Sequence, residues 1–306
     1  MIVVRYLILI AMAALLAPTA DARVLEVGPG KAFAMPSAAI AAAIDGDIVR
    51  IDAGTYADCA IISTSLTIEG VGPGAVITDK ICAGKALLIT NGADITLRNL
   101  TLQNAQVDEH NGAGIRAQGG KLTIDRVTFI NNENGILAGS IPNGEILIRD
   151  SDFIRNGACI KACAHGVYVG QIALLRVERS RFFETRTAHH IKSRARRTEV
   201  IGCDLADGET GTSSYQIEAP NGGVVIVRDN RIEKGPLSGN RLGAIVIGIE
   251  GETLPTPDPL ISGNRFTVDG GYPSFLVVNR TAANARLVGN ILAGSARPLD
   301  GLGSVQ

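Results

Sequence analysis

The chain has 306 residues, of which 46% are hydrophobic and 19% are charged, and its 29 basic and 30 acidic side chains leave a net charge of −1. The hydrophobic fraction excludes a disordered chain, because it is large enough to form a core. The charge balance excludes a nucleic-acid binder that works through bulk positive charge, so any anion site must be local.

Residues 1–22 have the pattern of a secretory signal peptide. Arg5 supplies a positive charge, residues 6–17 are a 12-residue apolar run, and Ala20-Asp21-Ala22 is a small-x-small cleavage site. The run is too short to span a bilayer. We therefore expect a mature chain that starts near Arg23, in the periplasm or outside the cell, with no membrane contact; an uncleaved anchor is the alternative.

An N-terminal cap is expected over about residues 23–56. The one convincing amphipathic helix is the Ala-rich segment from Pro36 to Ile44. It precedes the first strand repeat, where the open apolar end of a solenoid needs a cover.

The five cysteines fit an oxidising compartment. Cys59 and Cys82 are 23 residues apart, and Cys159 and Cys163 enclose a tight loop. We expect disulfides Cys59–Cys82 and Cys159–Cys163, with Cys203 left over as a small buried apolar residue. Metal binding by cysteine lacks support, because no CxxC spacing occurs.

A six-residue pattern recurs along the chain, and it predicts short strands. Each unit has an apolar residue, two mostly polar residues, a turn-like position, one further residue and an apolar residue, with starts 27, 24, 29, 23, 27, 34 and 26 residues apart. The alternation has period 2 and is bounded by Gly and Asn, so no helix is indicated. The units start at Leu97, Ile124, Ile148, Val177, Val200, Val227, Ile261 and Leu287.

A second strand lies between these units and repeats with the same period. Two or three strands per repeat predict an all-β solenoid of about nine to ten coils over residues 23–294, in which neighbouring coils bury each other's apolar faces. The Gly-rich residues 295–306 are expected to be a poorly ordered tail. The central apolar residues of the second strand are Ile115, Ile136, Val167, Ile191, Ile217 and Ile245.

The start of the mature chain resembles a known family. Val27-Gly-Pro-Gly-Lys-Ala-Phe33, the Ala-rich helix and Asp45-Gly-Asp-Ile-Val-Arg-Ile-Asp-Ala-Gly-Thr-Tyr56 are similar to the opening of right-handed parallel β-helix proteins of the pectate-lyase-like superfamily. The resemblance covers roughly Leu25 to Leu292 and implies a right-handed parallel β-helix. That fold carries lyases, epimerases, hydrolases and non-enzymes, so the reaction must be argued from the site.

Strand alternation places the candidate site on the outer face of the second strand. If Ile191 points inward, His190 and Lys192 point outward, and Arg194 follows on the same face. The same register puts Tyr168, between Gly166 and Gly170, in the preceding coil, and Gln216 and Glu218 in the following coil. The expected outer column is Arg116, Leu137, Tyr168, Lys192, Glu218 and Val246.

Three of the four histidines gather beside this column. His165 and His189 occupy equivalent corner positions of neighbouring coils, and His190 is next to them. We expect Tyr168, His190, Lys192 and Arg194 to be catalytic, and we expect the substrate to be bound by His165, His189, Gln216, Glu218 and Arg116.

The segment 176–197 is basic, with eight of the 29 basic residues in 22 positions. One interpretation is a groove for an anionic ligand; the other is a solvated face of salt-bridged arginines. The lack of Trp disfavours a neutral glycan, which needs aromatic stacking, whereas Arg and Lys can hold an anionic one.

No nucleotide-binding, GxSxG or zinc motif appears, and no cofactor is expected. Asp108-Glu109, and Asp204 with Asp207, are acidic enough for a weak calcium site, but the pattern is nonspecific.

The first functional hypothesis is a lyase or C5-epimerase that acts on a uronate-containing polysaccharide. Removal of the C5 proton requires neutralisation of the carboxylate, a base and an acid. Lyases and epimerases of this fold use Lys, Arg, His or Tyr on the outer strand face, and the resemblance implies the same here. Lys192 would be the base. The positive charges of Arg194 and His190 would favour its neutral form, and the negative charge of Glu218 would oppose this effect. Arg194 would bind the carboxylate, and His190 or Tyr168 would be the acid.

Two alternatives remain. Ala164-His165-Gly166 and His190-Ile-Lys192 loosely resemble motifs of polygalacturonases, but the expected aspartate pair is missing from residues 156–163, and hydrolysis needs two carboxylates. A non-catalytic glycan-binding or structural β-helix also needs a basic groove. In each case we expect a monomer whose partner is an anionic polysaccharide or oligosaccharide.

Overall fold

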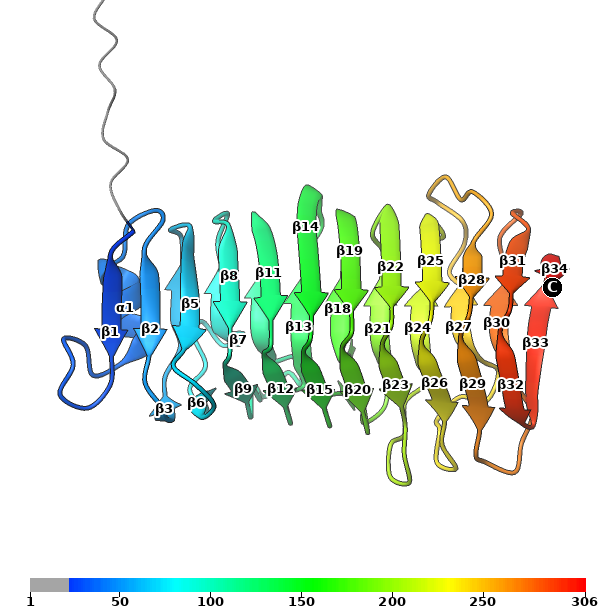
Figure 1. Cartoon of the computed structure of the whole chain (residues 1–306), viewed down its shortest axis with the longest axis horizontal. Coiled ribbons are helices and arrows are strands. Elements are labelled where there is room, and N and C mark those ends of the chain that lie inside the picture. Colours follow the sequence, from blue (N-terminus) through cyan, green and yellow to red (C-terminus); the bar gives the residue numbers. More distant parts are fainter. Residues whose placement is uncertain (1–21) are drawn as a thin grey trace, which may run out of the picture.

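The computed structural model describes residues 22–306, which form a parallel β-helix with one helix at its N-terminal end (Figure 1). The predicted signal peptide lies outside these residues except for Ala22. Three parallel sheets run along the axis, with 12, 10 and 10 strands. The predicted all-β solenoid is confirmed. Its longest sheet exceeds nine to ten strands because the cap and the C-terminal segment also contribute strands.

We call the sheets 1, 2 and 3 in the order in which the chain enters them. Sheet 1 contains β1 (Val24–Val27), β2 (Ile48–Ile51), β5 (Leu66–Gly70), β8 (Ile95–Arg98), β11 (Lys121–Asp125), β14 (Ile141–Arg149), β19 (Ile172–Glu178), β22 (Arg197–Ile201), β25 (Val224–Arg228), β28 (Leu260–Ser262), β31 (Ala285–Val288) and β34 (Gly303–Val305). Sheet 2 contains β3 (Gly54–Ala57), β6 (Ala75–Thr78), β9 (Thr101–Gln103), β12 (Thr128–Ile130), β15 (Asp152–Ile154), β20 (Arg181–Phe183), β23 (Asp204–Ala206), β26 (Arg231–Lys234), β29 (Arg265–Val268) and β32 (Ile291–Gly294). Sheet 3 contains β4 (Ala60–Ile62), β7 (Ala86–Thr90), β10 (Ala113–Ala117), β13 (Asn134–Ala138), β18 (Val167–Val169), β21 (His189–Ser193), β24 (Tyr215–Ala219), β27 (Gly243–Ile247), β30 (Ser274–Asn279) and β33 (Ala296–Gly301).

The helix α1 (Pro36–Ala42) covers the N-terminal end of the solenoid, as predicted, and ends two residues before Ile44. Pro36 opens it, which suits the first helical turn because its missing N–H has no partner there. Ala39 and Ile40 are buried against β1, β2 and β4. The apolar end of the first coil is therefore covered.

The recurring six-residue pattern marks the corner between sheets 1 and 2. The third residue of each unit, rather than the fourth, makes the turn: all eight are left-handed, with φ between 45° and 65°. The fourth residue points inward and forms a ladder along the axis, in which Asn230 bonds Asn264 at 2.9 Å and Asn264 bonds Asn290 at 2.9 Å. Cys203 belongs to this ladder. It is free and buried, as expected, and burial raises the pKa of its thiol to about 12.

The second strand of the repeat forms sheet 3, in the predicted register. Ile115, Ile136, Val167, Ile191, Ile217 and Ile245 pair in succession and are fully buried.

The residue before each of these also points inward, which strict alternation does not allow. A Cβ on Gly114, Gly135 or Gly166 would lie 2.8 to 3.3 Å from a ring carbon of Phe129, Phe153 or Phe182, respectively. These rings stack at centroid distances of 4.6 and 4.5 Å. The glycines therefore make room for a column of aromatic rings inside the solenoid.

Both predicted disulfides are present. Cys59 and Cys82 link adjacent coils with a Cα–Cα distance of 5.5 Å. Cys159 and Cys163, 4.1 Å apart at Cα, close a small antiparallel hairpin of β16 (Ala158–Cys159) and β17 (Cys163–Ala164) just before β18.

The C-terminal segment is not the poorly ordered tail that we expected. β33 pairs with β30, where Leu299 lies opposite Val277, and β34 pairs with β31. Gly301, with φ of +119°, is the last residue of β33, and Leu302 connects it to β34. The glycines of this segment thus allow a turn between strands of a further coil. No helix within residues 22–306 is long and apolar enough to cross a membrane.

The glycine–phenylalanine column gives a stability prediction. Gly135→Val should lower the free energy of unfolding by about 1–3 kcal/mol, because the added methyl groups overpack against Phe153 and the backbone of Gly166. In a Phe153→Leu background the loss should be smaller, since the ring is gone. Gly271→Ala is the matched control, as no atom lies within 4 Å of its Cβ position. Thermal unfolding followed by circular dichroism measures the wild type, the two single variants, the double variant and the control; equal losses in both backgrounds would show that the ring is not the obstacle.

Candidate functional site

The candidate site lies on the outer face of sheet 3, where the predicted column is confirmed. Tyr168 pairs with Lys192 and Lys192 with Glu218, so the three side chains are neighbours across β18, β21 and β24. Apolar clusters cover the face on either side, one around Ile89 and Leu137 and the other around Tyr215, Val246 and Val278. Tyr168, Lys192 and Glu218 thus form a polar island on this face, with a buried apolar cluster on either side.

Two glutamates hold the cations of this island. Lys192 Nζ lies 2.9 Å from Glu218 Oε2 and 2.6 Å from Glu250 Oε1. Arg194 lies 2.5 Å from the other oxygen of Glu250, and its Nε–H donates to the Tyr168 hydroxyl at 3.2 Å. Carboxylates therefore flank Lys192 on two sides, an arrangement that stabilises a charged ammonium rather than a free amine.

The corner histidines form a row of rings beside the island. His165 stacks on Tyr168 and on His189, with centroid distances of 5.6 and 5.0 Å, and His189 stacks on Tyr215 at 5.1 Å. The backbone N–H of each following coil donates to this row: His189 N–H to His165 Nδ1 at 3.2 Å, and Tyr215 N–H to His189 Nδ1 at 3.1 Å. Asn134 Oδ1 accepts the N–H of His165 in the same way, at 2.8 Å.

These contacts fix the protonation of both rings. Burial, together with His189, Lys192 and Arg194, lowers the pKa of His165 well below its usual value. Burial also lowers the pKa of His189, and Glu218, 2.9 Å from its Nε2, opposes this effect without cancelling it. Each neutral ring accepts at Nδ1 and carries its proton on Nε2, so neither can act as a base toward a substrate.

His190 and Gln216 do not lie on the outer face, contrary to the sequence-based expectation. They occupy the inward position that the glycines fill in earlier coils, and both are fully buried. His190 Nδ1 lies 2.7 Å from the Thr185 hydroxyl, and its Nε2 lies 3.2 Å from Asp207 Oδ1. Gln216 donates to Asp207 Oδ2 at 3.1 Å. The assignment failed because the strand begins with two successive inward residues.

The network around Asp207 continues the aromatic column as a buried polar plug. Lys234 is fully buried there and donates to Ser214 O at 2.9 Å; burial lowers its pKa to about 8. Gly166, expected to clear access to Tyr168, instead faces Phe182, and Gly170 packs against the backbone near Ser140.

Arg116 stays at the edge of the site. It lies on the outer face of β10, separated from Tyr168 by Leu137 of β13.

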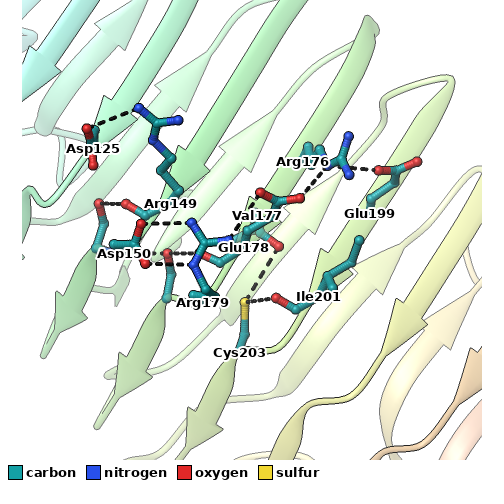
Figure 2. A network of polar contacts seen from close by, with 12 residues as sticks. Asp125, Arg149, Asp150, Arg176, Val177, Glu178, Arg179, Glu199, Ile201 and Cys203 are labelled. Atoms are coloured by element: carbon teal, nitrogen blue, oxygen red, sulfur yellow. Dashed lines mark hydrogen bonds and ion pairs between the residues drawn. The ribbon is translucent and has the colours of Figure 1, made fainter.

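The basic segment 176–197 is divided among several faces. Arg176 bridges Glu178 and Glu199 at 2.7 and 3.2 Å on sheet 1, and Arg179 pairs with Asp150 at 2.8 Å at the corner (Figure 2). Arg181 pairs with Asp152 on sheet 2. The interpretation as salt-bridged arginines therefore holds for these residues; of the eight Lys and Arg residues of the segment, Lys192 and Arg194 lie at the site.

The acidic residues considered for calcium do not form a common site. Asp204 pairs with Arg231, while Asp207 lies inside the solenoid. Among the described residues, no group of three or more His, Cys, Asp or Glu side chains is arranged to hold a metal ion.

Glu250, Asn221 and Tyr215 also lie at the site, although the sequence pattern did not point to them. Glu250 lies in the loop of residues 248–259 between β27 and β28, and Asn221, which accepts a hydrogen bond from Arg194, lies in the connection after β24. A signal for the loop existed: the repeat spacing there is 34 residues, the longest in the chain. The extra residues form an insertion, the loop that leads to β28 (Figure 1), and its Glu250 contacts Lys192 and Arg194 on the outer face of sheet 3.

No protein-family model and no curated protein matches the chain. Among solved structures, the alginate lyase from Paenibacillus sp. str. FPU-7 is 17% identical, with 92% of this chain and 99% of that chain covered and a TM-score of 0.72. The A-module of the mannuronan C-5 epimerase AlgE4 from Azotobacter vinelandii is 17% identical, covers 88% and 95%, and has a TM-score of 0.44. The first likeness shows the fold, a parallel β-helix, as the sequence predicted.

The buried histidines make stability depend on pH. The pKa of folded His165 lies below its unfolded value, so the unfolded chain binds more protons than the folded chain once pH falls below about 6.5. The contribution of His165 to the free energy of unfolding is therefore present in full above about pH 6.5 and is lost as pH falls below it. Between about pH 7.5 and about pH 5.5 the wild type should lose about 1 kcal/mol more than His165→Asn. Asparagine is a conservative control, since Asn134 accepts the equivalent N–H. Denaturant unfolding at both pH values tests this; an equal pH effect in the two proteins would contradict it.

Proposed function

We propose that the protein is a lyase or C5-epimerase that acts on a uronate-containing polysaccharide, with Tyr168, Lys192 and Arg194 as its catalytic residues. The observation that carries the proposal is the meeting of a phenol, an ammonium and a guanidinium on one outer face, with the Arg194 Nε–H donated to the Tyr168 hydroxyl at 3.2 Å. The alginate lyase with the same fold has a name that fits this substrate class.

The three residues divide the chemistry of C5 proton removal. Arg194 and Lys192 bind the uronate carboxylate and stabilise the charge that develops when the proton leaves. Tyr168 removes the C5 proton in its phenolate form, after its own hydroxyl proton has passed to solvent; the Arg194 guanidinium, whose Nε–H donates to the Tyr168 oxygen at 3.2 Å, stabilises that phenolate before the transfer. The Lys192 ammonium donates a proton to the leaving oxygen in a lyase, or to the opposite face of C5 in an epimerase. His190 has no role in this scheme, because it lies inside the solenoid.

His165 and His189 remain candidates for substrate binding through their rings, and Glu218 orients Lys192 and His189. Arg116, two coils away from Tyr168, would contact a neighbouring sugar of the polymer. Gln216 is withdrawn from the binding set, because it belongs to the buried plug.

The carboxylates of the site do not favour hydrolysis. Glu218 and Glu250 both contact Lys192, so two carboxylates are available. Burial alone would raise the pKa of each, but the contacts of Glu218 with His189 and Lys192, and of Glu250 with Lys192 and Arg194, bring both below the usual value. A glycosidase needs one protonated carboxyl with a raised pKa as its acid.

We place the activity in an oxidising compartment, the periplasm or the exterior of the cell. The two disulfides support this placement, since such bonds persist mainly in oxidising compartments.

The proposal is tested with alginate, polygalacturonate and glycosaminoglycans as substrates. Tyr168→Phe should lower turnover about 10²- to 10⁴-fold without change in far-ultraviolet circular dichroism, because it removes only the group that takes the proton. The measurement is the ultraviolet absorbance of the unsaturated product, with proton exchange at C5 as the signature of an epimerase.

Arg194→Lys should weaken binding of an acidic oligosaccharide by about tenfold, because a point charge does not reproduce a bidentate fork. Arg196→Lys is the matched control on the exposed side of the same connection. Binding of a polymer by the wild type without cleavage or exchange would assign the protein to the glycan-binding class instead.

A further inference from the structure

Glu250 holds the two site cations in the way that a substrate carboxylate would hold them. Its Oε1 lies 2.6 Å from Lys192 Nζ, and its Oε2 lies 2.5 Å from Arg194 Nη2. Each of the two carboxylate oxygens thus makes a short, charge-assisted contact with one of the two cations. The place that a uronate would take is therefore filled by a side chain of the protein itself.

The charges of the island cancel while Glu250 is bound. Lys192 and Arg194 are positive, Glu218 and Glu250 are negative, and the adjacent histidines are held neutral by burial. An arriving anion would meet a neutral surface with both cations occupied. Exchange of one carboxylate for another keeps the balance, whereas addition of a third carboxylate would leave an unpaired negative charge.

Glu218 and Glu250 differ in how easily each side chain can be displaced from the cations of the site. The side chain of Glu218 is 4% exposed and lies 2.9 Å from His189 as well as from Lys192. The side chain of Glu250 is 40% exposed, and the cations of the site are its only ion-pair partners among residues 22–306. Glu250 is thus the one that can be displaced without disturbing the row of rings.

Hydrogen bonds hold the backbone of the loop in place, whereas the contacts of the half-exposed Glu250 side chain are its ion pairs with Lys192 and Arg194. Glu250 N–H donates to Pro220 O at 3.0 Å, and the N–H groups of Thr253 and Leu254 donate to Asn221 O at 3.1 Å each. On the other side, Glu252 accepts the N–H of Ala282 at 2.9 Å. These bonds tie the loop to both neighbouring coils, so release of the site requires a change of rotamer at Glu250 rather than movement of a lid.

We propose that Glu250 is a built-in competitor that occupies the carboxylate subsite of the resting protein, and that an anionic ligand binds by displacing its side chain from Lys192 and Arg194. The inference rests on the proposed function for the identity of that ligand, and on the ion-pair geometry alone for the displacement. Glu250 thereby sets the affinity of the site for acidic sugars without taking part in the reaction.

The test compares Glu250→Gln with Glu252→Gln, which removes the same charge from the same loop but leaves the contacts of Lys192 and Arg194 intact. Each variant and the wild type are titrated at low salt, by calorimetry, with a mannuronate trisaccharide, a galacturonate trisaccharide and inorganic sulfate. Glu250→Gln should bind at least one trisaccharide, and sulfate, about tenfold more tightly than the wild type. Glu252→Gln should bind like the wild type.

The outcomes separate this inference from the proposed function. Tighter sulfate binding by Glu250→Gln alone, with no trisaccharide bound by any protein, would support the displacement and overturn the uronate function. Turnover of a uronate polymer with equal affinities in all three proteins would support the function and overturn the displacement. Absence of sulfate binding in Glu250→Gln, or weaker binding than in the wild type with an unchanged melting temperature, would also overturn it.

Discussion

The register between successive coils is the constraint on which every other feature of this protein depends. A coil cannot bury its apolar side alone, so each strand pairs in parallel with the strand one repeat away, and equivalent residues form columns along the axis. Ile191 has a place only because Val167 and Ile217 lie on either side of it. The same pairing sets Tyr168 beside Lys192, so the site is a consequence of the core register.

This dependence explains what could be predicted from the sequence. Period and alternation were sufficient for the β-helix, for the inward column and for the adjacency of Tyr168, Lys192 and Glu218. They did not predict that His190 points inward, because alternation assumes a regular strand. Strands of sheet 3 instead have two successive inward residues near their start. They also missed Glu250, since a loop outside the repeat has no register from which its position follows.

The chain distributes charge in a way that its net charge of −1 does not reveal. On sheet 1 and at its corner, arginines and acids of neighbouring coils pair with one another, as Arg179 does with Asp150. On sheet 3 the acids come from two different sources: Glu218 from the column and Glu250 from the insertion. Lys and Arg residues that lie close together in a solenoid sequence are therefore spread over several faces of the structure. The register between coils shows which of them lie on the same face.

The insertion of residues 248–259 has a consequence for how such a protein can evolve. A residue in a column packs on the equivalent residues of the coils above and below it. A substitution there therefore requires compensating substitutions in the neighbouring coils. The insertion lies outside the columns and is held mainly through its backbone, so its side chains can vary at little expense to the fold. Selection could therefore adjust ligand preference through one exposed position, Glu250, while the scaffold that presents Tyr168 and Lys192 stays unchanged.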